Sequence, residues 1–401
     1  MNNKSSKISL IAAAITVILG GSVVTEALAQ QPNVTLKGGN AIYSVPTADR
    51  RAPNLTSIGD AQAMPLPTVD QSPMDLVGEA LRQPDAAPMG KPGYSPGAPG
   101  NGLQSPMQLP LEQDDVTSEL FLEEGSGVEP QEFGTGGVPF TTSRVDTVVN
   151  NLSRTYPYSA AGKLYFKIGT GNYVCSASLI KQGVIVTAAH CVAEFGKNKF
   201  YTNFQFVPAK YNTLAPFGVW NAENVYIKTS YFNGTDSCAQ RGVVCANDVA
   251  VIRLAAQSGT FPGTRTGWLG YGWAGYGFTP NNLALINQLG YPVSHDAGNI
   301  MQRTDSQGVV SPSNSNNTVW GSRQTGGSSG GPELVNLGIR GVLTTSVGSE
   351  AGPNTVVGAT SWGYTDPAVK LQGASPFTTN NIVSLVNSAC LVNGVTRTAC
   401  K

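Results

Sequence analysis

The sequence predicts an all-β domain in residues 138–401, and three observations support this. Short apolar runs recur through the region and are separated by Gly, Asn and Ser, a pattern typical of strands and turns. One run alternates so that Val249, Val251 and Leu254 share a face, as in a half-buried strand. The region holds every cysteine and tryptophan of the chain. At about 260 residues it is long enough for one substantial β domain or two barrels.

The N-terminus has the pattern of a secretory signal over residues 1–29. Lys4 and Lys7 supply the positive start, Ile8–Leu19 is a short apolar stretch, and 27–29 read Ala-Leu-Ala, a small-residue cleavage site. The alternative is an uncleaved N-terminal anchor, although the apolar run is short for a membrane span. We expect a secreted protein, extracellular or periplasmic, in a compartment where disulfides persist.

Residues 30–137 differ in composition from the rest of the chain. They contain 14 of the 26 prolines, no cysteine and no tryptophan, and 92–100 read P-G-Y-S-P-G-A-P-G. Such a stretch buries too little apolar surface to offset the entropy of ordering. The composition predicts a Pro/Gly-rich, largely disordered pro-segment.

The net charge of zero conceals a charge difference between these two regions. Residues 30–137 carry 5 Lys and Arg against 14 Asp and Glu, a net charge of −9 that is concentrated in 112–132. Residues 138–401 carry 18 against 10, a net charge of +8. An acidic tail can simply keep a chain soluble. The sharper hypothesis is that the pro-segment docks on the basic domain and inhibits it until it is cleaved.

The six cysteines predict short-range disulfides, because neighbouring pairs close short loops. A zinc site is the competing interpretation. The chain has no C-x-x-C and only two histidines, so we expect no metal and no cofactor. The expected pairs are Cys175–Cys191, Cys238–Cys245 and Cys390–Cys400.

Three motifs occur in a fixed order: V-T-A-A-H-C at 186–191, N-D-V-A-V-I-R-L at 247–254 and G-G-S-S-G-G-P at 326–332. A serine hydroxyl is a weak nucleophile and needs a base, and the base needs a carboxylate to hold its tautomer. His190, Asp248 and Ser329 are the candidates. Alone, each has an ordinary alternative: a packed histidine, an Asp cap and a Gly-Ser loop.

The glycines around Ser329 permit a tight turn whose amides converge on one point. Gly327 and Ser329 amides are the predicted oxyanion donors. The segment also matches G-x-S-x-G, the nucleophile elbow of α/β-hydrolases, whose histidine follows the serine. No histidine follows Ser329 here, so that interpretation is excluded. His295, in Y-P-V-S-H-D, lacks such a setting and is predicted to be an ordinary loop residue.

These motifs resemble those of the chymotrypsin-like (trypsin-fold) serine endopeptidases, particularly the bacterial glutamyl-endopeptidase-like branch, over most of 145–388. The resemblance implies two six-stranded antiparallel β-barrels with a C-terminal helix and a cleft between the barrels. It implies that Ser361 bonds near Asp248, and that Trp362 and Gly363 form an edge strand that pairs with substrate. T-T-N-N-I-V-S-L-V at 378–386 suits the helix, with Thr378 or Thr379 as its cap.

The chain departs from the family pattern at two positions that matter. Ser328 replaces the Asp that receives the new N-terminal amine in animal enzymes, so a pro-segment must act by another route. Ser361 stands where glutamyl endopeptidases have His, which removes the main reason to expect glutamate preference. Arg323 resembles the residue at the base of the primary specificity pocket. There it could favour an acidic side chain or point into solvent.

The leading interpretation is a serine endopeptidase, secreted as a precursor, that acts on polypeptide substrates. The alternatives are a catalytically silent protease-fold binding protein and an esterase on the same fold. A nucleic-acid partner is disfavoured because the charge of residues 138–401 is modest and no basic-aromatic stripe occurs. We expect a monomer with no membrane contact after signal cleavage.

Overall fold

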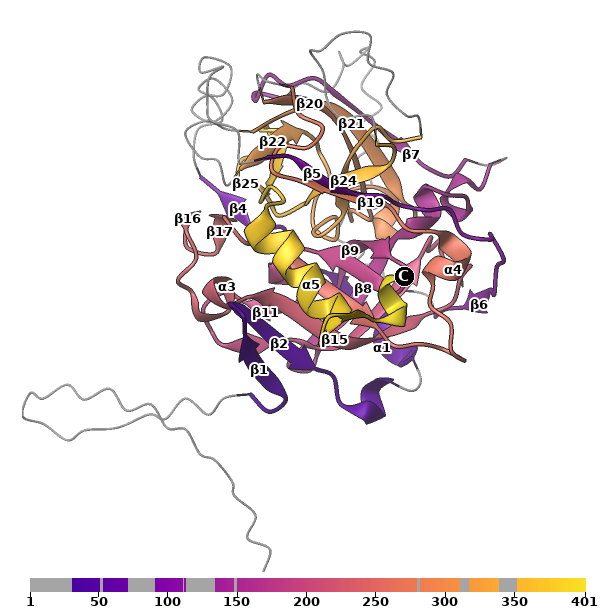
Figure 1. Cartoon of the computed structure of the whole chain (residues 1–401). Coiled ribbons are helices and arrows are strands. Elements are labelled where there is room, and N and C mark those ends of the chain that lie inside the picture. The colour runs from indigo at the N-terminus through magenta and orange to yellow at the C-terminus, as the bar shows by residue number, and fades with distance from the viewer. Residues whose placement is uncertain are drawn as a thin grey trace, which may run out of the picture.

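The computed structural model shows an all-β protein built from two barrels with a short helix lying across them (Figure 1). The described residues are 31–50, 53–70, 91–110, 112, 134–147, 150–279, 282–310, 317–338 and 352–401. The predicted signal, residues 1–29, and almost all of the acidic stretch 112–132 lie outside them. In the described part of the chain, no helix is long and apolar enough to cross a membrane.

The first barrel is a closed ring of antiparallel strands. In ring order they are β15 (Trp220–Lys228), β13 (Thr202–Pro208), β8 (Ala161–Ile168), β9 (Gly171–Lys181), β10 (Val184–Thr187) and β18 (Ala250–Leu254). Pairing of β15 with β18 closes the ring. Ile185 and Ile252 lie opposite each other in neighbouring strands and are fully buried. Strands β10 and β18 are apolar almost throughout, and most residues of the six strands are buried.

The second barrel closes because the continuous segment formed by β24 and β25 pairs with a different neighbouring strand at each of its two ends. Its strands are β20 (Leu283–Gly290), β21 (Gln302–Val310), β22 (Thr318–Gly321), β23 (Pro332–Val335), β24 (Thr355–Ala359), β25 (Trp362–Tyr364) and β26 (Leu371–Ala374), with β19 (Gly270–Trp273) beside β24. The chain passes from β24, which pairs with β23, through Thr360 and Ser361 to β25, which pairs with β26. The predicted two-barrel fold is confirmed.

Disulfides tie the connections of the barrels. The three predicted neighbour pairs, Cys175–Cys191, Cys238–Cys245 and Cys390–Cys400, are all formed. The first joins β9 to the turn that follows β10.

Other short elements lie outside the strands of the barrels. They are β11 (Ala193–Glu194), β12 (Lys199–Phe200), β14 (Leu214–Ala215), β16 (Cys238–Gln240), β17 (Val243–Cys245), β27 (Leu391–Val392), β28 (Val395–Thr396), α1 (Thr56–Gly59), α3 (Thr229–Asn233) and α4 (Gly263–Thr266).

The C-terminal helix begins where the sequence predicts. Thr378 caps it: its hydroxyl accepts from the Asn381 amide at 3.1 Å, and the Asn381 side chain accepts from the Thr378 amide at 2.7 Å. A π-helical turn, Thr379–Val383, leads into α5 (Ser384–Cys390). Buried Leu385 and Ala389 face the barrels, and α5 contacts β15 and β18 of the first barrel.

The described parts of residues 30–137 are ordered, which differs from the expectation of a largely disordered segment. They add strands to both barrels: β1 (Val34–Lys37), β2 (Asn40–Ser44) and β3 (Ala61–Ala63) to the first, and β4 (Thr68–Val69) and β5 (Gly93–Ser95) to the second. β6 (Met107–Gln108) pairs with β14, and β7 (Phe140–Arg144), just beyond the predicted boundary, pairs with β21.

The expectation of disorder was wrong for these residues because composition describes a segment in isolation. Strands β2, β3, β4 and β5 bond directly to barrel strands that are already ordered, so they need little apolar surface of their own. The low-complexity run 92–100 illustrates this. A side chain at Gly97 would lie 2.4 Å from the Trp268 carbonyl, so a glycine is needed for the close approach.

Glu112 fixes the end of this segment in a buried ion cluster. Its carboxylate lies 2.5 Å from Lys163 Nζ and 2.7 Å from Lys210 Nζ, and the Tyr165 hydroxyl donates to it at 2.6 Å. Burial alone would raise the pKa of Glu112, but the two ammonium groups outweigh it and lower the pKa to about 2. Glu112 is therefore charged and paired at neutral pH.

Replacing this carboxylate should destabilise the full-length chain. We expect Glu112→Gln to lower the free energy of unfolding at pH 6 by about 3–5 kcal/mol, because two buried cations lose their partner. The folded pKa lies below the ordinary 4.5, so the contribution is complete above 4.5 and is lost as the pH falls toward 2. Urea unfolding of parent and variant at several pH values measures this. Glu194→Gln, at an exposed position, is the control and should change nothing.

Candidate active site

His190 is positioned by the end of strand β10. The chain leaves Thr187 at that end and turns through Ala188 and Ala189, both fully buried, into a short 3₁₀ turn that contains His190. The bond between Cys175 and Cys191 holds this turn to β9. His190 is itself buried, with 5% of its surface exposed.

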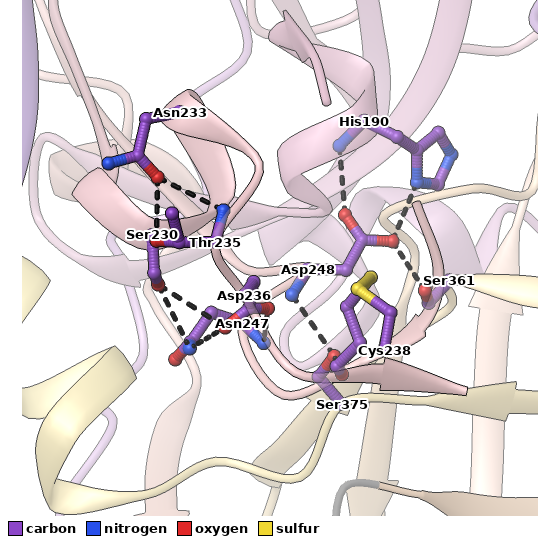
Figure 2. Close-up of a disulfide and its surroundings, with 11 residues drawn as sticks. His190, Ser230, Asn233, Thr235, Asp236, Cys238, Asn247, Asp248, Ser361 and Ser375 are labelled. Atoms are coloured by element: carbon purple, nitrogen blue, oxygen red, sulfur yellow. Dashed lines mark hydrogen bonds and ion pairs between the residues drawn. A yellow bond between two sulfur atoms is a disulfide. The ribbon is translucent and has the colours of Figure 1, made fainter. Parts of the chain in front are cut away.

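Asp248 contacts His190 at two points (Figure 2). One carboxylate oxygen accepts from the His190 backbone amide at 2.8 Å, and the other lies 2.8 Å from His190 Nδ1. The Ser361 hydroxyl donates to that second oxygen, which is the contact that the family resemblance implied. The Asp248 amide in turn donates to the Ser375 hydroxyl at 3.1 Å. The imidazole is thus held by a carboxylate, and hydrogen bonds with Ser361 and Ser375 hold Asp248 in turn.

The charge of Asp248 is set by these contacts. Burial alone would raise the pKa of its carboxyl, but His190 and the hydrogen bond from Ser361 outweigh the burial and lower the pKa. An ionised carboxylate at Nδ1 favours the tautomer with its proton on that nitrogen. That tautomer leaves Nε2 as a proton acceptor.

The Ser329 turn packs directly against the strand end that carries His190. Gly327 and Gly330 have φ of +88° and +77°, which favour glycine. The Ser329 carbonyl accepts from the Ser176 amide of β9 at 2.7 Å. A side chain at Gly330 would lie 1.9 Å from Thr187 Oγ1. The two motifs, far apart in sequence, are therefore in contact.

The Ser329 side chain is completely buried. Among the described residues its hydroxyl has no hydrogen-bond partner, and His190 Nε2 lies 3.7 Å from Cys191 Sγ. The Ser328 hydroxyl, by contrast, donates to the Thr325 carbonyl at 2.7 Å. The structure thus shows the His–Asp contact of the predicted triad and no hydrogen bond between His190 and Ser329.

One predicted oxyanion donor has an acceptor in this structure. The Gly327 amide donates to the Met64 carbonyl at 3.1 Å. The distance from the Gly327 nitrogen to this oxygen is in the range expected between an oxyanion-site donor and an oxyanion.

A pocket of about 310 Å³ opens beside the Ser329 turn. Its lining includes Arg323, Gln324, Gly363 and Lys370, and within the described residues it contains two cations and no carboxylate. Trp362, whose side chain is fully buried, precedes Gly363 on β25 at this edge. Of the predicted substrate-binding residues, Arg323 and Gly363 line this pocket, whereas Ser361 bonds to Asp248 and Trp362 is not part of the lining.

His295 lies in a turn, in the loop setting that was predicted for it, and Arg323 reaches it there. Arg323 Nε donates to His295 Nε2 at 2.9 Å, and His295 Nδ1 lies 2.8 Å from the Ser294 hydroxyl. Burial and the neighbouring Arg323 lower the pKa of His295 to about 4. The neutral ring can therefore accept from Arg323. No sequence motif joins these two residues, which are 28 positions apart.

Two groups in the described chain have metal-ligand residue types: Cys175, His190 and Cys191, and Asp236, Cys238 and Cys245. Each includes a cysteine pair that is disulfide-bonded. Thiolates are the cysteine form that binds metal, so neither group suits a metal ion.

The family is shown by a match between residues 149–371 and the Trypsin family model. The chain belongs to the trypsin family of serine proteases. A comparison with curated protein sequences found no match.

Solved serine protease structures are also similar to this chain. The thermostable protease AL20 from an extremophilic microorganism is 22% identical, with TM-score 0.45, covering 57% of this chain and 96% of its own. Anisep from Arthrobacter nicotinovorans is 26% identical, with TM-score 0.45, covering 58% and 95%. A Glu endopeptidase is 21% identical, with TM-score 0.44, covering 62% and 95%.

Gly330 offers a direct test of the packing between the two motifs. We expect Gly330→Ala to reduce hydrolysis at least about 100-fold, because the methyl group displaces the Ser329 turn from Thr187. Gly259→Ala is the matched control: it also has positive φ, of +76°, but open space around it. Gly259→Ala should lower the free energy of unfolding by only about 1–2 kcal/mol and leave the rate of hydrolysis unchanged. Equal effects of both substitutions on hydrolysis would contradict the packing argument.

Proposed function

We propose that this protein is a secreted serine endopeptidase, made as a precursor, with His190, Asp248 and Ser329 as its catalytic triad. The observation that carries the proposal is the two-point contact of buried Asp248 with His190, beside a serine turn packed on the same strand end. The trypsin-family membership supports proteolysis. The three disulfides support an oxidising compartment.

In the proposed reaction, Ser329 Oγ attacks the carbonyl carbon of a peptide bond and His190 Nε2 takes its proton. The tetrahedral oxyanion binds to the amides of Gly327 and Ser329. Asp248 stabilises the imidazolium that forms and stays ionised throughout. His190 then donates the proton to the leaving amine. Water attacks the acyl-enzyme with His190 as base, which releases the acid and restores Ser329.

Two observations favour a peptidase over the alternatives. The β25 backbone already bonds to an added strand, β4, so this edge can pair with an extended peptide in a way that a simple ester would not need. A silent binding protein has no need for the buried Asp248 carboxylate, whose burial is costly unless it is paired. The cleft lining therefore suits a polypeptide substrate.

We further propose a preference for an acidic side chain in the pocket. Arg323 and Lys370 line it without a carboxylate among the described residues. His295 accepts from Arg323 and so orients the guanidinium without neutralising its charge. The carboxylate of an incoming Glu or Asp would accept a charge-assisted hydrogen bond from the Arg323 guanidinium.

Ser329→Ala tests the nucleophile. We expect peptide-bond hydrolysis to fall by on the order of 10⁶-fold, because the acyl-enzyme can no longer form. The measurement is a mass-spectrometric digest of a diverse peptide mixture by protein recovered from the medium. Ser178→Ala is the matched control, since its hydroxyl is also buried without a hydrogen-bond partner in the described chain. Hydrolysis that persists in Ser329→Ala refutes the triad.

Arg323→Ala tests the pocket preference in the same digest. We expect cleavage after Glu and Asp to fall at least about 10-fold relative to cleavage after uncharged residues, because a charge-assisted hydrogen bond is lost. Lys199→Ala, at an exposed position on β12, should leave the preference unchanged. An unaltered profile in Arg323→Ala would dismiss the cation as a specificity determinant.

A further inference from the structure

Residues 61–69 lie along the proposed substrate cleft, held at both ends by backbone pairing. At one end β3 pairs in parallel with residues 172–174 of β9, and the Met64 amide donates to the Val174 carbonyl at 2.9 Å. At the other end β4 pairs in parallel with β25. The segment therefore crosses from the first barrel to the second, past the Ser329 turn.

At the crossing, a carbonyl of this segment occupies the oxyanion donor. The Met64 carbonyl accepts from the Gly327 amide at 3.1 Å. A side chain at Gly326 would lie 2.8 Å from that same oxygen, so the oxygen is packed against the turn. The position that a substrate oxyanion needs is already filled.

The residues that follow line the specificity pocket and pair with the cleft edge. Leu66 lines the pocket, and a side chain at Gly363 would lie 2.8 Å from Leu66 Cδ2. The Gly363 amide donates to the Pro67 carbonyl at 2.9 Å, and the Thr365 amide donates to the Val69 carbonyl at 3.1 Å. The edge strand proposed to bind substrate thus bonds to the chain itself.

The direction of the segment differs from that of an acyl donor. In a substrate, the residue whose carbonyl enters the oxyanion site also supplies the pocket side chain, and earlier residues lie along the edge strand. Here the pocket side chain, Leu66, comes two residues after the carbonyl of Met64, and later residues lie along β25. The bond after that carbonyl leads to Pro65, whose nitrogen carries no hydrogen.

We propose that residues 61–69 are a built-in inhibitor that fills the substrate cleft in the direction opposite to a substrate, and so resists cleavage. The proposal rests on the proposed function and adds how the precursor is restrained. Contacts on both sides of the segment keep it at high effective concentration near the cleft. Earlier in the chain, β2 pairs with β15; later, β5 pairs with β19 and Glu112 forms an ion pair with Lys163. A competing substrate must displace a tethered ligand.

Leu66→Lys in the full-length chain tests the proposal. The new cation would enter a pocket that contains Arg323 and Lys370, so the segment should leave the cleft. We expect the initial rate of peptide hydrolysis to rise at least 10-fold over the parent. Leu103→Lys is the matched control from the same N-terminal segment: Leu103 is 65% exposed, and its replacement should leave the rate unchanged.

A second measurement does not depend on catalysis. Amide hydrogen exchange is followed for peptides covering 361–365 and 172–174, in full-length Ser329→Ala with and without Leu66→Lys. Loss of protection with Leu66→Lys supports the contact. Unchanged exchange at both places overturns it, whether or not the chain is a peptidase. Loss of protection without hydrolysis in any form that retains Ser329 supports the contact and refutes the proposed function instead.

The direction in which the segment lies in the cleft is tested by whether the protein cleaves it. Prolonged incubation of the full-length parent, followed by intact-mass analysis, should show no product cut between residues 64 and 65. Such a product, absent from Ser329→Ala, would show that the segment binds as a substrate does and would overturn the reversed direction. A parent that already hydrolyses peptides as fast as Leu66→Lys would overturn the inhibition itself.

Discussion

The buried carboxylate of Asp248 is the interaction on which the site depends. It accepts three hydrogen bonds, two from His190 and one from Ser361, and its own amide donates to Ser375. His190 and Asp248 belong to the first barrel, whereas Ser361 and Ser375 belong to chain segments of the second (Figure 2). Because an unpaired buried carboxylate is very costly, these bonds also tie the two barrels together.

The second constraint is the close approach of the Ser329 turn to strands β9 and β10. Gly330 has no room for a side chain against Thr187, and the Ser329 carbonyl bonds to Ser176. These contacts put the Ser329 turn and His190 at one seam between the two barrels. The proposed oxyanion site and pocket lie along the same seam, which explains why a single short segment, 61–69, can reach both.

The N-terminal segment shows how an edge can order a chain that composition assigns to disorder. Its strands bond to barrel edges, and Glu112 adds a buried ion cluster on Lys163 and Lys210. The Ser328 hydroxyl, which stands in place of an aspartate, donates to the Thr325 carbonyl and carries no charge for an ion pair with a new N-terminus. Restraint by occupation of the cleft would therefore stand in place of activation through a buried N-terminal amine.

The sequence by itself determined the β architecture, the three disulfide pairs, a helix cap at Thr378 or Thr379 and the candidates for the triad, because each depends on local pattern or on short spacing. Tertiary structure alone decided that Arg323 meets His295, that Glu112 is buried between two lysines, and that residues 61–69 cross the cleft. These contacts join segments far apart in the chain. Neither composition nor periodicity contains information about which edge a distant strand will pair with, since backbone hydrogen bonds are the same for every residue except proline.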